Sequence, residues 1–455
     1  MKVTEKLSDF IIKTNFEDIP NECVISAKRA IMDCIGVALA GSITLTGKII
    51  IRFINKMGGN PEATVISGGV KSSVVNAALA NGTLAHALDY DDVSPSLKGH
   101  LSVVILPAIL AIGESLNVSG KSLLESYILG FEIGGKLGKI DPTQLHKKGW
   151  HSTSTIGSLA ATAACSKLLR LNSDQLMNAF GITTSLASGI LRNFGTMTKP
   201  LHAGNAARNG VASAILAKDG LTACSDVVER EGGFFNLFLG RKKFNFSRMS
   251  AKLGNPFDIV YPGVEIKPYP CCAACHTAID AMLYLIYKYD IYYSQVKQVR
   301  CGINDFHFKE LMYHNPQNNL EAKFSLEYCL ARVILNRKLS LDQFDDCKMF
   351  DPQVQEAMRK IYIYIHPKRE VLKSFSDDFT KVKIILKDGR EFSQRLGREK
   401  RKGGSENPLT WDDIASKFQD CASSVIDNQK IEKILVILQD LENLKELRVL
   451  TDLLI

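Results

Sequence analysis

The 455-residue sequence lacks the features that mark several specialised classes of protein. The apolar run over residues 101–112 is too short to span a bilayer and contains Pro107. Residues 1–20 do not have the architecture of a signal peptide. The eleven cysteines show no disulfide-framework pattern, and many lie in apolar helical segments. We therefore expect a cytoplasmic protein with reduced thiols and no membrane partner.

The sequence also has no large excess of either positive or negative charge. The sequence has 56 Lys and Arg residues against 48 Asp and Glu residues, which gives a net charge of +8. Much of the local excess lies in residues 366–373 and 398–402, without interleaved aromatic residues. This pattern argues against nucleic acid as a partner and favours a small anionic molecule.

The first 266 residues follow helical periodicity. Gly, Asn, Asp and Pro separate most of the helical segments, and Ala, Gly and Ser are dense within them. That density predicts close packing of helix on helix rather than a core built on a sheet. At most a short strand is expected, over residues 63–67. The expected helices cover residues 22–40, 72–87, 120–137, 153–169, 173–186 and 199–218.

The pattern changes after Lys267 and changes back after Leu409. Two alternating runs flank a Lys-Asp-Gly-Arg turn, which predicts a β-hairpin over residues 382–396. The chain is expected to be helical again from residue 409 to its end. The other elements expected in this part are a strand over residues 296–303 and helices over residues 275–289, 320–337 and 354–361.

These patterns predict a mainly α fold in which a large all-helical domain carries an inserted, smaller α+β domain. We place residues 1–266 and 402–455 in the helical domain. Residues 267–401 form the inserted α+β domain, which would act as a lid.

The expected helix that begins near Lys199 carries a row of polar side chains. Lys199, His202, Asn205 and Arg208 recur at helical spacing and can share one face. Such a face on an apolar helix must be satisfied internally or must meet a ligand. The free N–H groups at the start of the helix would favour an anion. A solvated or salt-bridged basic face is the alternative.

A second group of polar residues follows the expected helix over residues 72–87. His86 and Asp89 are three positions apart, and Asp91, Asp92 and His100 come soon after. A histidine beside carboxylates is a workable acid–base pair. The same set could bind a divalent metal. The alternative is a helix end followed by a solvated acidic turn.

His151 precedes another expected helix, whose N-cap we expect to be Ser152 or Thr153. The helix dipole would keep this imidazole neutral and able to accept a proton. A surface cap residue is the alternative.

The turn that contains Lys267 also contains clustered cysteines. Cys272 and Cys275 form a C-x-x-C pair beside Cys271 and His276, which raises a redox or metal interpretation. No second pair of that kind is present, and no thioredoxin-like pattern lies beside it. We therefore expect no metal and no structural disulfide at these cysteines. Lys267 could instead meet a substrate carboxylate.

Six sequence motifs occur in the order in which one known family carries them. Together they resemble the MmgE/PrpD family, which includes 2-methylcitrate dehydratase, cis-aconitate decarboxylase and iminodisuccinate epimerase. The resemblance covers nearly the whole chain. The motifs are ANGTLAHALDYDD (80–92), GWH (149–151), GTMTKPLHAG (195–204), KPYPCC (267–272) with His276, AKFSLEY (322–328) and ENPL (406–409).

The resemblance implies a homodimer that works without metal or organic cofactor, with its active site between the two domains. Lysines would bind the carboxylates of a dianionic or trianionic substrate, and histidines would move protons at a carbon next to a carboxylate. By this resemblance we assign catalysis to Asp89, His100, His151 and Tyr313, and substrate binding to Lys199, His202, Lys267 and Cys272.

Two departures from the family pattern bear on the reaction. Cys272 stands where the decarboxylase carries a further histidine, and Val93 stands where it carries a threonine. These departures argue against cis-aconitate decarboxylation but do not choose between dehydration and epimerisation. The leading hypothesis is dehydration of a small hydroxy-polycarboxylate, as in 2-methylcitrate dehydratase. Decarboxylation of the cis-aconitate type and epimerisation of the iminodisuccinate type are the alternatives within enzymes. A cysteine-based redox or metal protein and an inactive helical scaffold are the alternatives outside this chemistry.

Overall fold

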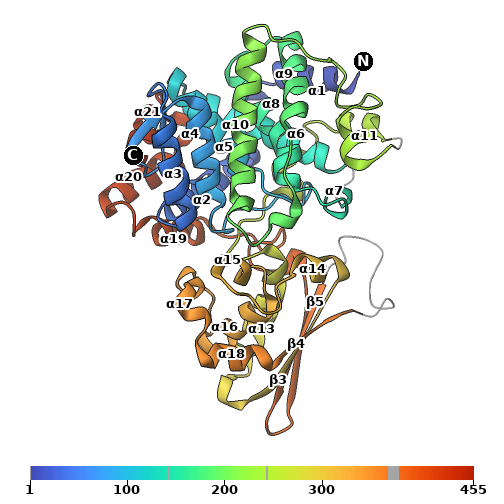
Figure 1. Cartoon of the computed structure of the whole chain (residues 1–455), viewed down its shortest axis with the longest axis vertical. Coiled ribbons are helices and arrows are strands. Elements are labelled where there is room, and N and C mark those ends of the chain that lie inside the picture. The colour runs from blue at the N-terminus through green and yellow to red at the C-terminus, as the bar shows by residue number, and fades with distance from the viewer. Residues whose placement is uncertain (1, 141–142, 242–243, 367–378) are drawn as a thin grey trace. The chain divides into compact units, whose positions relative to one another are not determined.

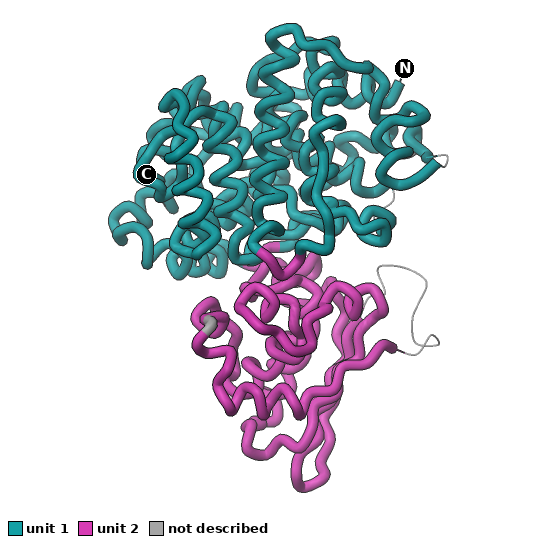
Figure 2. Tube along the Cα trace, viewed as in Figure 1, with its two compact units in different colours: residues 1–193, 197–265, 410–455 teal, residues 194–196, 266–409 magenta. Residues whose placement is uncertain are grey.

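Figure 1 shows the computed structural model of the chain, which describes residues 2–140, 143–241, 244–366 and 379–455. The fold is mainly α, as predicted, with a smaller α+β part. Two compact units are distinguished in Figure 2. Unit 1 comprises residues 1–193, 197–265 and 410–455, and unit 2 comprises residues 194–196 and 266–409. The chain returns to unit 1 at Thr410 rather than at residue 402.

Unit 1 is a bundle of helices with one two-stranded ribbon, formed by β1 (Ala63–Val65) and β2 (Val70–Ser72). Helix α10 packs against α4, α5, α8 and α9. The longer helices are α1 (Val3–Lys13), α2 (Asn21–Ser42), α3 (Leu45–Met57), α4 (Val74–His86), α5 (Ser102–Leu116), α6 (Gly120–Gly138), α8 (Ser152–Leu168), α9 (Ser173–Leu186), α10 (Thr198–Lys218), α19 (Trp411–Ala422) and α20 (Asn428–Gln439). The shorter ones are α7 (Gln144–Lys147), α11 (Phe234–Leu239), α12 (Phe246–Ser250) and α21 (Arg448–Thr451).

Small residues bring α4 and α10 into close contact. A Cβ atom on Gly204 of α10 would lie 2.2 Å from the carbonyl oxygen of Leu79 and 2.2 Å from Oγ1 of Thr83, both on α4. Only glycine fits at such a separation. The close approach sets the first turn of α10 beside the last turn of α4, where the polar residues of both motifs lie.

The end of the chain contributes to unit 1 through α19, which packs on α2. A Cβ atom on Gly36 of α2 would lie 3.0 Å from the Phe418 ring of α19. This contact explains why a segment from beyond unit 2 belongs to the helical unit.

Unit 2 contains a four-stranded sheet in the order β4-β3-β5-β6. Strand β3 (Val296–Ile303) is parallel to β4 (Ile361–Ile365) and antiparallel to β5 (Phe379–Leu386), and β5 is antiparallel to β6 (Glu391–Gly397). The predicted hairpin is confirmed, with Gly389 at a φ of 89° in its turn. The helices of unit 2 are α13 (Ala273–Lys288), α14 (Asp305–Glu310), α15 (Asn319–Ala322), α16 (Leu326–Asn336), α17 (Asp346–Met349) and α18 (Pro352–Arg359).

Two predictions in this unit were wrong in detail. The helix expected over residues 320–337 is divided into α15 and α16, because Ser325 caps α16 by accepting a hydrogen bond from the N–H of Tyr328. The helix expected over residues 354–361 ends at Arg359, and the next residues form β4. Their alternating Ile and Tyr side chains suit a strand that pairs in parallel with β3.

The two basic runs of the sequence are described in part. Residues 398–402 begin with a short 3-10 helix over Arg398–Lys400. The basic run 366–373 lies outside the described residues except for His366.

Within the part of the chain that the structure describes, no single helix is long and apolar enough to cross a membrane. By length and composition alone, α2 and α3, bent by 84° at their junction, meet that requirement as a pair.

Candidate active site in the helical unit

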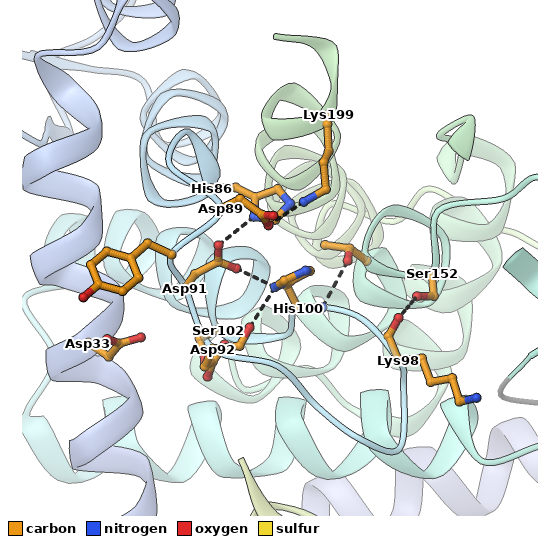
Figure 3. Close-up of polar contacts among 12 residues, drawn as sticks. Asp33, His86, Asp89, Asp91, Asp92, Lys98, His100, Ser102, Ser152 and Lys199 are labelled. Carbon is orange, nitrogen blue, oxygen red and sulfur yellow. Dashed lines mark hydrogen bonds and ion pairs between the residues drawn. The ribbon is translucent and has the colours of Figure 1, made fainter. Parts of the chain in front are cut away.

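The last turn of α4 and the acidic turn after it supply most of the candidate site (Figure 3). His86 is the last residue of α4, and Asp89 takes a left-handed φ of 50°. Asp89, Asp91 and Asp92 are each at most 4% exposed. The alternative of a solvated acidic turn is therefore wrong, and these buried carboxyl groups need partners.

The carboxylate of Asp91 lies between two imidazoles. Its Oδ1 is 2.9 Å from Nδ1 of His86, and its Oδ2 is 2.8 Å from Nδ1 of His100. Burial alone would raise the pKa of Asp91, but the electrostatic attraction and hydrogen bonds of the His100 and His86 imidazoles outweigh burial and hold that pKa well below its usual range. Asp91 is therefore ionised at neutral pH and fixes the orientation of both rings.

His100 has one ring nitrogen engaged by the protein. Besides facing Asp91, its Nδ1 lies 2.8 Å from the backbone carbonyl oxygen of Asp92. A carbonyl oxygen only accepts hydrogen bonds, so Nδ1 must carry the hydrogen. In the neutral ring the lone pair then lies on Nε2, which is the form a general base requires. The His100 side chain is 12% exposed, whereas His86 and His151 are each 1% exposed.

His86 supports this arrangement from the side. Its ring centroid is 4.6 Å from that of His100. Burial lowers the pKa of His86 to about 3, although Asp91 opposes the shift. His86 is therefore neutral at pH 7 and donates its Nδ1 hydrogen to Asp91, as expected of a supporting residue on a helix face.

Lys199, in the first turn of α10, forms a buried ion pair with Asp89. The distance from Nζ to Oδ1 is 2.7 Å, and both side chains are at most 6% exposed. Pro200 follows in the same turn, where the N–H that proline lacks would have no helical partner. The carboxylate that orients His100 is thus that of Asp91. Asp89 pairs with Lys199 instead.

His151 and His202 meet in the core of unit 1. Their Nδ1 atoms are 3.1 Å apart. Burial and the neighbouring Lys199 lower the pKa of His202 to about 4, and burial with Lys199 and the other imidazoles holds the pKa of His151 well below its usual range. Both rings are neutral at pH 7, so one Nδ1 donates and the other accepts.

The start of α8 fixes the loop that carries His100. His151 itself is the N-cap of α8, so the expectation of Ser152 or Thr153 at that position was wrong. Those two hydroxyl groups bind the loop instead. Thr153 accepts a hydrogen bond from the N–H of His100, and Ser152 donates one to the carbonyl oxygen of Lys98. Burial, rather than the helix dipole alone, keeps His151 neutral.

A second set of buried polar groups contacts the acidic turn. Asp92 accepts a hydrogen bond from Ser102, whose hydroxyl is 2.5 Å from that of Tyr127. Burial raises the pKa of Asp92 well above its usual range and so favours the neutral carboxyl group. Nearby, Lys417 of α19 lies 2.6 Å from Asp33 and donates to the carbonyl oxygen of Tyr90 at 2.7 Å.

The sequence reasoning did not single out Asp91, Tyr127 or Lys417. Asp91 belongs to a motif with three aspartates, and periodicity does not tell which of them faces the imidazoles. Lys417 could have been noticed, because it lies three residues after Ile414 and four before Cys421, on the buried face of an amphipathic helix. A lysine at such a position is expected to have a buried partner.

The histidine and aspartate side chains around Asp91 are of types that can bind a divalent cation. One ligand atom from each of His86, Asp89, Asp91 and His100 lies within 4.8 Å of the others. In the structure, however, these groups satisfy one another, because Lys199 is paired with Asp89 and both imidazoles face Asp91. A cation would have to displace the Lys199 ammonium and turn two rings. The residues thus fit a metal-free acid–base site better than a metal centre.

The remaining predicted site residues lie in unit 2. Lys267 is 2% exposed and precedes α13, and Cys272 is the N-cap of α13. Tyr313 donates a hydrogen bond to the carbonyl oxygen of Phe194 at 2.7 Å. A Cβ atom on Gly195, at a φ of 80°, would lie 2.6 Å from the Tyr313 ring. That Lys267, Cys272 and Tyr313 act on the same substrate as the unit 1 residues stays a prediction.

The chain matches two family models. The MmgE/PrpD N-terminal domain matches residues 5–247, and the MmgE/PrpD C-terminal domain matches residues 269–443.

Three proteins are similar to the chain over almost all of its length. A cis-aconitate decarboxylase of Homo sapiens is 27% identical over 99% of this chain and 94% of that protein. A cis-aconitate decarboxylase of Mus musculus is 26% identical over 99% of this chain and 93% of that protein. A cis-aconitate decarboxylase of Aspergillus terreus is 27% identical over 99% of this chain and 96% of that protein. With both domain models matched in order, the chain belongs to the MmgE/PrpD family.

Proposed function

We propose that the protein is a cofactor-independent lyase that moves a proton at a carbon next to a carboxylate of a small polycarboxylate. The orientation of His100 carries this proposal. Asp91 and the carbonyl of Asp92 hold its Nδ1 hydrogen, so the lone pair on Nε2 is free to exchange a proton with a substrate. Membership of the MmgE/PrpD family and the decarboxylase relatives support a lyase.

In this chemistry, Nε2 of His100 takes the proton from the substrate carbon or returns it. The imidazolium that forms is stabilised by the Asp91 carboxylate, 2.8 Å from Nδ1. Removal of a proton next to a carboxylate moves negative charge onto the carboxylate oxygens. Lys199 is the cation of unit 1 suited to stabilise that charge, with Asp89 fixing its ammonium.

His151 was expected to be a neutral imidazole that helps to move protons. Because its pKa lies well below the usual range, His151 is neutral at working pH. We assign it hydrogen-bond donation to the substrate from Nε2, with His202 as the Nδ1–H donor that fixes this tautomer.

Two reactions are consistent with the proposed roles of these residues. Decarboxylation of cis-aconitate is favoured by the full-length relatives. Cys272 and Val93, which stand where the decarboxylase pattern has histidine and threonine, argue against decarboxylation, and dehydration of a hydroxy-polycarboxylate of the 2-methylcitrate type is then the leading alternative. Both reactions need a positioned group that exchanges a proton at carbon, and neither needs a metal or an organic cofactor at this site.

Parallel incubations with cis-aconitate, 2-methylcitrate, citrate and iminodisuccinate distinguish the reactions. Product analysis by NMR shows loss of carbon dioxide for a decarboxylase, loss of water for a dehydratase and inversion without change of mass for an epimerase. We expect turnover of cis-aconitate or of a hydroxy-tricarboxylate. If folded protein turns over none of the four, the proposal fails.

Lys267, Tyr313 and Cys272 complete the proposed substrate contacts. A polycarboxylate carries more negative charge than the single cation of the Lys199–Asp89 pair can offset. Lys267, which is 2% exposed, is the proposed partner for a second carboxylate. Tyr313 carries a hydroxyl group that is proposed to take part in proton transfer. Cys272 lies close to Lys267 in the chain and is proposed to line the carboxylate site.

We also propose that the protein is a homodimer formed through α3 and α10. An apolar surface on these helices surrounds a cavity of about 610 Å³. Contiguous apolar surface of this kind marks an interface, and a second copy would cover it with the same surface. The exposed apolar residues of this surface are Leu45, Ile49, Phe53, Met57, Met197 and Leu201.

All eleven cysteines are free, which favours a reducing compartment such as the cytoplasm.

A further inference from the structure

Three cysteine thiols meet inside unit 2. The Sγ atoms of Cys271, Cys275 and Cys329 lie within 4.8 Å of one another. All three residues are 0% exposed. Cys271 lies in the turn before α13, Cys275 in the first turn of α13, and Cys329 in α16. The expectation of no metal rested on missing ligands, and the fold supplies a third thiol that lies 54 residues further along the chain than Cys275 (329 − 275).

A buried histidine follows the second of these thiols in the chain. His276 follows Cys275 in α13. Its Nε2 lies 3.2 Å from the backbone carbonyl oxygen of Cys271. The side chain is 1% exposed. Three cysteines and one histidine form a common ligand set of four-coordinate zinc in proteins.

Buried cations surround this turn. Lys323 donates a hydrogen bond to the carbonyl oxygen of Pro270 at 3.0 Å, and Arg401 donates one to that of Ala273 at 2.5 Å. Both side chains are 4% exposed. Three thiolates and one Zn²⁺ carry a net charge of −1, which would be costly to bury alone. Cations that bind the carbonyl groups on either side of Cys271 and Cys272 offset that charge and fix the ligands.

We propose that Cys271, Cys275 and Cys329 form a structural site for a thiophilic divalent cation of the zinc class, and that the His276 ring turns from the Cys271 carbonyl to become the fourth ligand. On binding, the three thiols release their protons to solvent and each sulfur donates a lone pair to the ion, with no change of oxidation state. The ion would tie the turn of Lys267 and Cys272 to α16. Because the site is fully buried, we expect it to fill while unit 2 folds.

Metal content of the full chain tests the proposal. The protein is produced with added zinc under reducing conditions, gel-filtered, and analysed for zinc per chain by mass spectrometry. Cys329→Ser is the test variant, and Cys301→Ser is the matched control, because Cys301 is also 0% exposed in unit 2 but lies in β3. We expect about one zinc per chain in the wild type and the control and a loss of at least tenfold in occupancy in Cys329→Ser.

Cobalt substitution of the wild type provides a second readout if Cys329→Ser does not fold. Three thiolate ligands give strong sulfur-to-cobalt charge-transfer absorption, and His276→Gln should weaken binding without removing that absorption. Wild-type protein that stays well below one metal per chain after reconstitution overturns the proposal, as does a disulfide between two of the three cysteines. Turnover is measured separately, so failure of this proposal and failure of the proposed lyase activity are distinguishable.

Discussion

His151 and His202 face each other through their Nδ1 atoms at 3.1 Å. Because both imidazoles are neutral at pH 7, a single hydrogen lies between the two nitrogens. This relationship connects α8 and α10 and sets which nitrogen of His151 can donate to a substrate. It also makes the stability of unit 1 sensitive to pH.

Replacing His202 by phenylalanine should change how stability depends on pH. The folded pKa of His202 is lowered to about 4 from 6.5, so between these values the unfolded chain binds the proton that the folded chain rejects. Wild-type protein therefore loses stability as pH falls below about 6.5 through this residue. Relative to the wild type, the unfolding free energy of His202→Phe should rise by about 2 kcal/mol between pH 7.5 and pH 5. Urea titrations at both pH values measure it, and an equal difference at the two would contradict the assignment.

Asp91→Asn should lower kcat strongly while the fold remains. A carboxylate has two accepting oxygens, whereas the amide of asparagine has one, so only one of the two imidazoles can keep its Nδ1–H bond to residue 91. We expect kcat to fall by about 10²-fold or more, since general acid–base assistance is worth about 10²–10⁴-fold, with a smaller change in KM.

The matched control for Asp91→Asn is Asp388→Asn, which removes an exposed carboxylate paired with Arg390 in the β5–β6 turn. That variant should keep wild-type turnover. A comparable fall in both variants, or a fall in KM alone for Asp91→Asn, would remove Asp91 from its positioning role.

Lys199→Ala and Lys267→Ala should each raise KM by at least about tenfold, because each removes a cation proposed to bind a carboxylate. Lys→Arg at either position should not restore binding, since the guanidinium is larger and planar. Steady-state kinetics with the identified substrate measure both effects. An unchanged KM in Lys267→Ala would exclude the second carboxylate contact.

Lys199→Ala also leaves Asp89 buried without its cation, which typically costs about 3–5 kcal/mol of stability. The double variant Lys199→Ala, Asp89→Asn should recover most of that loss while KM stays high. Stability that falls further in the double variant would show that the pair is not the main partner of either residue.

The sequence predicted an element correctly where the contacts that form it join residues close together in the chain. The hairpin of β5 and β6 was predicted because its turn residues and alternation are contiguous. Strand β4 was missed because its pairing partner β3 lies about sixty residues earlier, and only that pairing makes the Ile-Tyr alternation a strand.

The same limit applies to the candidate site. The sequence showed His100, His151, Lys199 and the acidic motif, since each has a distinctive chemistry at a helix boundary. It could not show that Asp91, and not Asp89, faces His100, because the left-handed φ at Asp89 decides which way each carboxylate points. Cys329 was not connected with Cys271 for the same reason, since only the packing of α16 on α13 brings the thiols together.

The proposed dimer predicts that charge on the apolar surface of α3 and α10 will separate the subunits. Phe53 is 46% exposed and Leu201 is 39% exposed beside the same cavity. The double variant Phe53→Glu, Leu201→Glu should elute as a monomer in size-exclusion chromatography with light scattering. Leu237→Glu is the control, because Leu237 is 71% exposed on α11 and should leave the dimer intact. A monomeric wild type would contradict the proposal.

The most direct test of the central claim follows deuterium from D₂O into the substrate carbon next to the carboxylate, with the wild type, His100→Gln and His314→Gln. His314 is an imidazole of unit 2 with a 49% exposed side chain, so its variant serves as the control. We predict deuterium incorporation by the wild type and the control, and a rate lower by about 10²–10⁴-fold in His100→Gln. Incorporation at the wild-type rate in folded His100→Gln would show that another group carries the proton.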